Sequence, residues 1–109
     1  MTTVTSQRFR TPSPTERQLG LWVDRIGENV DAGWPRERRL LGLCGAVYVR
    51  KGSGWLEASG RSAVRVRAGQ TMLLFADEPH RYGGGEQPWN TCWVVWGGPR
   101  AAAMSTLGY

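Results

Sequence analysis

A chain of 109 residues is long enough for one domain with a small core, and its 15 Gly, six Pro and six Trp favour a β-rich fold over a helical bundle. No apolar run is long enough to span a bilayer, and residues 1–20 lack the apolar segment of a secretory signal, so we expect a cytoplasmic protein with no membrane partner. The net charge of +5 is spread along the chain apart from +2 within residues 1–18, which argues against a basic nucleic-acid-binding module.

The polar N-terminal segment, residues 1–18, contains Pro12 and Pro14, which interrupt a regular helix. We therefore expect a flexible N-terminal arm, with ordered structure beginning at Leu19. Residues 19–26 alternate well enough for a first strand. Residues 27–38 carry the glycines and the proline of a connecting turn.

The stretch LLGLCGAVYV at residues 40–49 is a continuous apolar run of strand length. It predicts a strand that is buried on both faces. A buried helix is the competing interpretation, which Gly42 and Gly45 disfavour because glycine weakens a helix interior.

Further short strands follow at regular spacing, separated by turns that contain glycine or proline. They cover residues 55–58, 62–67, 71–75 and 89–96. Such a series predicts an all-β fold, a small antiparallel sandwich or barrel. Residues 100–109 contain helix-forming residues after a Gly-Gly-Pro stop, and they predict the start of a C-terminal helix.

The chain's only histidine, His80, limits the chemistry open to this protein. The spacing from Gly69 to His80 resembles that of the second metal-binding motif of cupin barrels, but the first motif needs further histidines that the chain lacks. We therefore expect no bound metal and no other cofactor. Cys44 and Cys92 lie in apolar strand patterns, where a thiol is inert, so we expect buried, reduced cysteines and no catalytic residue. The glycines at 83–85 are expected to let the chain turn through positive φ.

A binding pocket is the function that remains. Alternation along the last strand places one set of side chains on one face and a second set on the other. The first set is Trp89, Thr91, Trp93 and Val95, and the second is Asn90, Cys92, Val94 and Trp96. Indole rings suit the apolar face of a sugar, and Thr91 supplies a hydroxyl. A barrel filled by its own side chains is an equally open alternative.

Several motifs between residues 47 and 99 occur in a fixed order: a G-x-G turn, a glycine-containing hairpin, a second turn, a Pro-His-x-Tyr motif and a tryptophan-rich strand. They are Gly52-Ser53-Gly54, Ser59-Gly60, Ala68-Gly69-Gln70, Pro79-His80-Arg81-Tyr82, Trp89, Trp93 and Trp96. This order resembles the N-terminal, cupin-like effector-binding domain of AraC/XylS-type transcription regulators. The resemblance implies a small antiparallel cupin-like barrel, a double-stranded β-helix or jelly roll. The sequence departs from the family pattern at Ala68, Gln70 and Phe75, which affects loop geometry more than the fold.

The resemblance also implies ligand-binding residues. Tyr82 and Trp93 match a tyrosine and a tryptophan that hold the sugar in the arabinose-responsive member, where the tryptophan stacks on the sugar. Thr91 falls where that member has a histidine, and an arginine of that member matches either Arg38 or Arg39. His80 is expected at the rim of a hairpin as a turn and hydrogen-bonding residue, with pocket contact as the lesser alternative.

From the resemblance we expect three parts: residues 1–18 as an arm that folds over the ligand, residues 19–99 as the barrel, and residues 100–109 as the start of a linker or dimerisation helix. The function implied is sensing of a small-molecule effector, expected to be a sugar, by a non-enzymatic domain. DNA would be contacted only through a C-terminal helix-turn-helix domain, which does not follow Tyr109 here. Formation of a homodimer is left open. The alternative function is that of a small cupin enzyme, such as an isomerase or dioxygenase.

Overall fold

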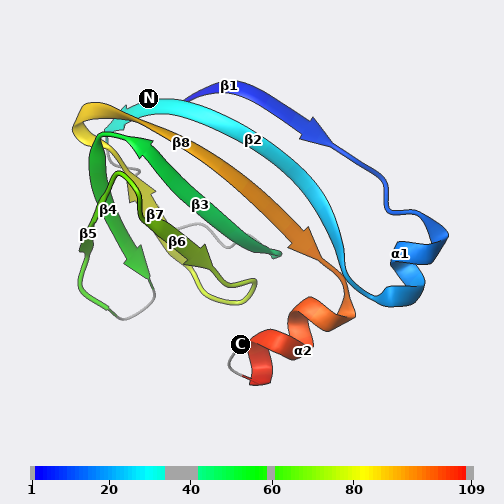
Figure 1. Ribbon diagram of the computed structural model, residues 1–109. Coiled ribbons are helices and arrows are strands. Elements are labelled where there is room, and N and C mark those ends of the chain that lie inside the picture. The colour runs from blue at the N-terminus through cyan, green and yellow to red at the C-terminus, as the bar shows by residue number, and fades with distance from the viewer. Residues whose placement is uncertain (1, 34–41, 59–60, 108–109) are drawn as a thin grey trace.

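The computed structural model describes residues 2–33, 42–58 and 61–107 (Figure 1). Its elements in chain order are β1 (Thr2–Phe9), α1 (Pro14–Leu19), β2 (Trp22–Gly33), β3 (Cys44–Lys51), β4 (Ser53–Ala58), β5 (Val64–Arg67), β6 (Thr71–Leu74), β7 (His80–Gly83), β8 (Gly85–Gly97) and α2 (Pro99–Leu107). Neither helix of the described chain is long and apolar enough to cross a membrane.

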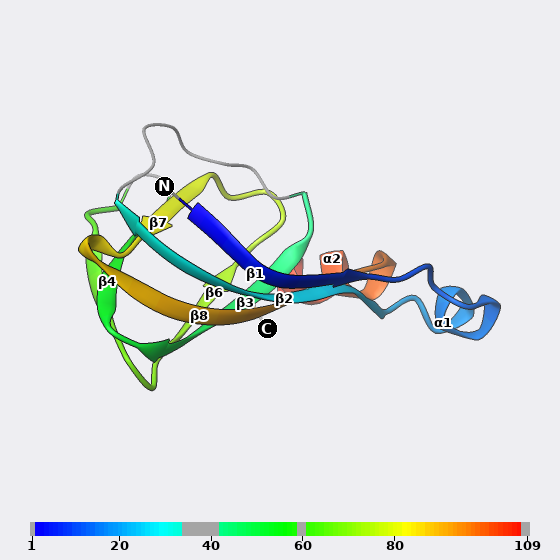
Figure 2. The same cartoon turned by 90° about the horizontal axis from the view of Figure 1, so that it is seen from above.

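The strands form two antiparallel sheets, which Figures 1 and 2 show from two sides. The larger sheet has five strands in the order β1-β2-β8-β3-β6, and the smaller has three in the order β5-β4-β7. Of the glycines at 83–85, which were expected to turn through positive φ, only Gly85 does so, at φ 74°. The prediction of an all-β, antiparallel fold with a helix at its C-terminal end is confirmed.

The hydrophobic core lies on one face of the larger sheet, which we call the inner face. Its buried members come from both sheets and are Val47, Val49, Val66, Met72, Leu74 and Trp89. On β3 the burial alternates between residues 47 and 49, because Val47 and Val49 are buried whereas Tyr48 between them is 40% exposed. The prediction that this strand is buried on both faces is therefore wrong at Tyr48, although Cys44, at the start of the strand on the same face as Tyr48, is buried.

Strand β2 continues well beyond its predicted end. Residues 27–33, which were expected to form a turn, pair with β8 as far as the Gly33–Gly85 pair, and the stretch up to Asp31 also pairs with β1. Pairing on both edges provides backbone partners that outweigh the low strand preference of glycine and aspartate.

The N-terminal segment contains a strand and a short helix. Strand β1 pairs with β2 from Thr2 to Phe9. The prediction that the prolines prevent a helix is wrong, because Pro14 occupies the first turn of α1, where its missing N–H is not needed. Ser13 and Glu16 cap this turn reciprocally, and Gly20 ends it in the left-handed conformation.

Two sets of contacts hold α1 in place. The guanidinium of Arg10 donates to both carboxylate oxygens of Glu16 at 2.6 Å and to the carbonyl oxygen of Val23 at 3.1 Å. At the other end of the helix, the backbone N–H of Arg100 donates to the carbonyl oxygen of Gly20 at 2.9 Å. Helix α1 therefore connects the end of β1 to the start of α2.

Replacement of Arg10 by alanine should raise the pKa of the Glu16 carboxyl toward its ordinary value of 4.5. In the native chain the hydrogen bond from Arg10, followed by that from the Ser13 backbone, lowers the pKa of Glu16 to about 2. A lowered carboxyl pKa stabilises the folded segment above pH 4.5, and this contribution is lost as the pH falls toward about 2. NMR titration of the Glu16 side-chain carbonyl carbon measures the change.

Arg17→Ala is the matched control for this titration, because it removes the same charge from the residue next to Glu16 on α1. The pKa of Glu16 should stay low in that variant. Equal pKa values of Glu16 in the two variants would contradict a specific contact with Arg10.

Candidate functional site

Three aromatic rings follow one another across the inner face between the two sheets. The rings of His80 and Tyr82 on β7 are stacked, with centroids 6.1 Å apart and an interplanar angle of 18°. The Tyr82 ring lies 6.2 Å from that of Trp89 on β8, tilted by 54°. His80 and Trp89 are 2% and 1% exposed. The series therefore runs from the smaller sheet to the larger one inside the domain.

Glycines make room for the two large rings of β8. A Cβ atom on Gly54 of β4 would lie 2.7 Å from Cζ3 of Trp89, and one on Gly27 of β2 would overlap the indole of Trp93. Real side chains do not approach so closely, so each indole occupies space that the glycine opposite leaves free. These two contacts fix where the rings of Trp89 and Trp93 lie.

The polar groups of the inner face differ in whether they have partners. Nε1 of Trp93 donates to Oδ1 of Asn29 at 3.2 Å, and Nδ1 of His80 lies 3.2 Å from the carbonyl oxygen of Glu78. The Thr91 side chain is only 1% exposed. By contrast, Nε1 of Trp89 is buried and has no hydrogen-bond partner among the described residues. Such a donor is unusual in a folded interior.

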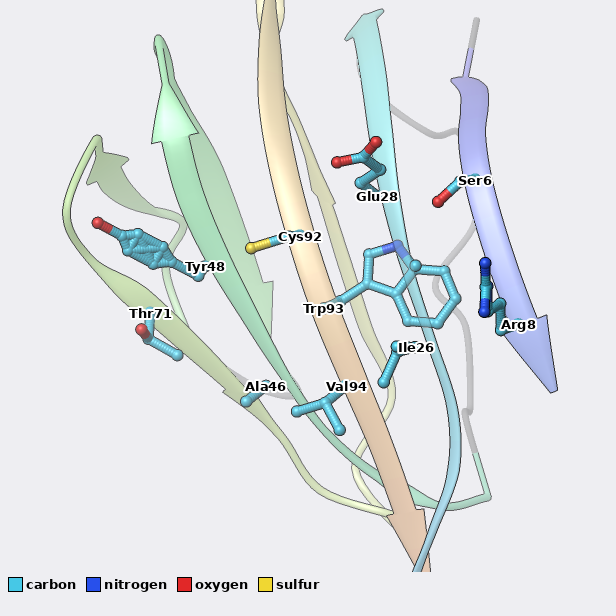
Figure 3. Close-up of a pocket in the computed structure, with 11 residues that line it drawn as sticks. Ser6, Arg8, Ile26, Glu28, Ala46, Tyr48, Thr71, Cys92, Trp93 and Val94 are labelled. Carbon is cyan, nitrogen blue, oxygen red and sulfur yellow. The ribbon is translucent and has the colours of Figure 1, made fainter. Parts of the chain in front are cut away.

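A separate hollow of about 560 Å³ lies on the opposite, outer face of the larger sheet (Figure 3). Strand register places its side chains there, because Tyr48 pairs with Cys92 and Thr71, and Cys92 pairs with Glu28. Figure 3 shows Tyr48 and Thr71 on one side of the hollow and Ser6 and Arg8 on the other. The hollow is therefore distinct from the space between the two sheets.

The structure brings four of the six predicted site residues to the inner face. They are His80, Tyr82, Thr91 and Trp93. Trp93 also borders the outer hollow. Arg38 and Arg39 lie outside the described residues. The alternation predicted for β8 holds, since Trp89, Thr91 and Val95 are all buried.

His80 does not lie where the sequence placed it. It was expected at the rim of a hairpin as a turn residue, but it is the first residue of β7 and pairs with Ala58 of β4. Burial of the imidazole follows from this pairing, because the side chain then faces the interior with Tyr82, two residues further along the strand.

Two groups of the inner face, Asn29 and the indole N–H of Trp89, were not among the predicted site residues. Asn29 was assigned to a turn, so its contact with Trp93 could not be foreseen. Trp89 was placed on the correct face, but its unpartnered N–H depends on the fit against Gly54, which no sequence pattern reports.

The arrangement offers groups that can bind a ligand. His80, Tyr82, Trp89, Thr91 and Trp93 include no carboxylate. They offer aromatic faces, two hydroxyl groups and ring nitrogens, which can stack on a ligand and hydrogen-bond to it. No cluster of three or more metal-binding side chains occurs in the part of the chain that the structure describes.

The comparisons with known proteins agree with this architecture. A family model described as "AraC-like ligand binding domain" matches residues 43–104. Similar solved structures include a cupin superfamily protein of Desulfitobacterium hafniense (TM-score 0.61, 7% identity, covering 87% of this chain and 76% of that chain). They also include the cupin domain of Schizosaccharomyces pombe Cnp3, with a TM-score of 0.66 and 8% identity, covering 98% of this chain and 71% of that chain. The EutQ protein of Clostridium difficile has a TM-score of 0.62 and 13% identity, covering 88% of this chain and 68% of that chain. These likenesses show a cupin-like fold. No curated protein matches the chain.

Replacement of Gly27 by alanine should destabilise the domain by about 1–3 kcal/mol, because the added methyl group overlaps the Trp93 ring and lies 2.7 Å from the carbonyl oxygen of Ser6 on β1. Urea unfolding monitored by circular dichroism measures the change. Combining Gly27→Ala with Trp93→Leu should remove the part of this cost that comes from the indole ring, while the close contact with the Ser6 carbonyl oxygen remains. Fully additive effects of the two substitutions would contradict the packing described.

Proposed function

Because this chain belongs to the AraC-like ligand binding domain family, we propose that it senses a small polar effector, a sugar or sugar-like molecule, which binds between the two sheets. The domain carries out no reaction on the effector. It acts as the regulatory part of a transcription regulator, in which a separate helix-turn-helix domain contacts DNA.

The unpartnered N–H of Trp89 is the observation that carries this proposal. A buried indole nitrogen without an acceptor costs free energy, about 1–3 kcal/mol for a lost hydrogen bond. A hydroxyl oxygen of a ligand would accept this hydrogen bond and recover that energy. The donor also belongs to the aromatic series of the inner face, so the ligand would contact Tyr82 as well.

A sugar satisfies both features of the site. Its C–H face is apolar and packs against aromatic rings, while its hydroxyl groups donate and accept hydrogen bonds in the ring plane. Trp89 would donate to a sugar oxygen, and the hydroxyl of Thr91 could act as donor or acceptor. The resemblance to the arabinose-responsive member assigns Tyr82 and Trp93 to the same role.

The effect of the ligand would be transmitted through the elements that carry the site. Asn29, which accepts from Trp93, lies on β2, and β2 also pairs with β1. The end of β1 is connected through Arg10 and α1 to the first residues of α2. An effector that moves Trp93 would thus alter how the N-terminal strand and the C-terminal helix are held.

Thermal unfolding of the chain against a panel of mono- and disaccharides tests the proposal. A ligand that binds only the folded state should add about 2.7 kcal/mol of stability at one hundred times its dissociation constant. Trp89→Phe keeps an aromatic ring but removes the donor, so it should weaken the ligand-dependent shift by about tenfold in apparent affinity.

Trp55→Phe is the matched control, because Trp55 is 39% exposed on β4 and lies outside the aromatic series. This variant should keep the full ligand-dependent shift. The absence of a shift with every saccharide would reject a sugar as the effector. Equal losses in the Trp89 and Trp55 variants would reject the space between the sheets as the binding site.

A further inference from the structure

The smaller sheet (Figure 1) directs three arginines away from the core. Its other side packs inward, because Val66 of β5 belongs to the core and Leu56 of β4 and Tyr82 of β7 pack against it. Alternation along each strand therefore points the neighbouring residues outward. These outward residues, which we call the arginine face, are Ser53, Trp55, Glu57, Arg65, Arg67 and Arg81.

Two of the three positive charges on the arginine face have no acidic partner. Arg81 forms an ion pair with Glu57 at 3.0 Å, so these two charges offset each other. Arg65 and Arg67 are exposed, and neither forms an ion pair with a described residue. Three arginines against one glutamate give this face a charge of +2.

Neutral groups hold the side chain of Arg65 in place. Its guanidinium lies over the ring of Trp55, 5.6 Å from the centroid, and its Nη2 donates to Oγ of Ser53 at 2.9 Å. Trp55 lies directly opposite Arg65 in the pairing of β4 with β5. A guanidinium has five N–H donors, and the hydrogen bond to Ser53 uses one of those of Arg65. An oriented cation whose charge is not neutralised and whose other donors are available is suited to binding a phosphate group.

We propose that the arginine face contacts the phosphate backbone of DNA. Arg65 and Arg67 are two residues apart on β5, which places them about 7 Å from each other along the strand. Duplex DNA carries one negative charge per about 1.7 Å of its axis, so both guanidiniums would meet phosphates. Such contacts position a protein on DNA without reading the base sequence.

The composition of the arginine face favours DNA over an acidic protein. Four of its six residues are charged. Charged residues are depleted at the centre of protein–protein interfaces, whereas protein–DNA interfaces are polar and strongly positive. The spread of charge along the sequence argued against a nucleic-acid contact, but the pairing of β5, β4 and β7 gathers these arginines on one surface.

The choice of DNA as the partner rests on the proposed function, whereas the charge of the face does not. In that function a separate helix-turn-helix domain of the same protein holds DNA close to this chain. Tethering raises the local concentration of DNA, so a contact that is weak for the isolated chain would still form in the whole regulator. The arginine face would thus hold the sensing domain against the DNA backbone.

Fluorescence anisotropy of a labelled short duplex of arbitrary sequence, titrated with the native chain at several salt concentrations, tests the proposal. Two neutralised phosphates predict that the logarithm of the binding constant falls with the logarithm of salt concentration with a slope of about −2. Arg65→Gln and Arg67→Gln should each reduce the magnitude of the slope by about 1. Arg8→Gln is the matched control, because Arg8 is exposed on β1 of the larger sheet and carries the same charge. It should leave the slope unchanged.

Trp55→Leu tests the orientation of Arg65 separately from its charge. Loss of the aromatic ring beneath the guanidinium should weaken DNA binding about two- to fivefold. The slope should stay at about −2, because both arginines remain. An unchanged affinity would show that Trp55 does not position Arg65 for the contact.

Two results would overturn the arginine face as a DNA contact. One is the absence of binding by the native chain at about 50 mM salt. The other is an equal slope in the Arg65, Arg67 and Arg8 variants, which would assign the binding to net charge alone. Polyglutamate that binds more tightly than DNA at the same salt concentration would identify an acidic protein as the partner instead.

Stabilisation by saccharides separates this inference from the proposed function. The Arg65→Gln/Arg67→Gln double variant should lose DNA binding and keep the full saccharide-dependent shift in thermal unfolding, since both residues point away from the space between the sheets. Absence of DNA binding together with an intact shift would overturn the arginine face and leave the effector site standing. DNA binding through this face without any saccharide-dependent shift would reject the effector proposal alone.

Discussion

Two indole rings on one strand must fit inside a small domain, and the rest of the structure accommodates them. Trp89 fills space opposite Gly54 of β4, and Trp93 fills space opposite Gly27 of β2. The two rings thereby connect three strands from both sheets. Since each glycine has no side chain, the contacts are close, and neither strand can shift its register without losing them. The inner face, the orientation of β2 and the placing of β7 beside Trp89 all follow from this packing.

The same packing leaves a polar group unsatisfied. Trp93 finds an acceptor in Asn29, but Trp89 lies deeper and finds none among the described residues. A phenylalanine in place of Trp89 would have no buried N–H group without a partner. The indole is therefore favourable over phenylalanine only where an acceptor for its N–H is supplied. In the proposed function, a hydroxyl group of the effector would supply that acceptor. The interior of this domain is therefore strained in its hydrogen bonding and not in its backbone, because every described residue with positive φ is a glycine.

The sequence predicted those features that depend on local pattern. The alternation on β8 identified Trp89, Thr91 and Trp93 as neighbours on one face, and the Pro-His-x-Tyr motif indicated the family. Predictions from the sequence were wrong where pairing between distant strands decides the structure. Asn29 was assigned to a turn, although β1 and β8 hold it in a strand from both sides. His80 was placed in a turn because its pairing with Ala58, more than twenty residues earlier, has no local signal. The outer face was likewise hidden, because the run at residues 40–49 gives no indication that Tyr48 stays exposed.

The most direct test of ligand binding at the inner face is the indole N–H resonance of Trp89 in a nitrogen-15 NMR spectrum. The chain has six tryptophans, so each indole signal can be assigned by replacing one residue at a time with phenylalanine. Addition of the saccharide that stabilises the chain should move the Trp89 signal downfield and slow its exchange with solvent, while the signal of the exposed Trp55 stays in place. Saturation with such a ligand that leaves the Trp89 signal unmoved would contradict the account.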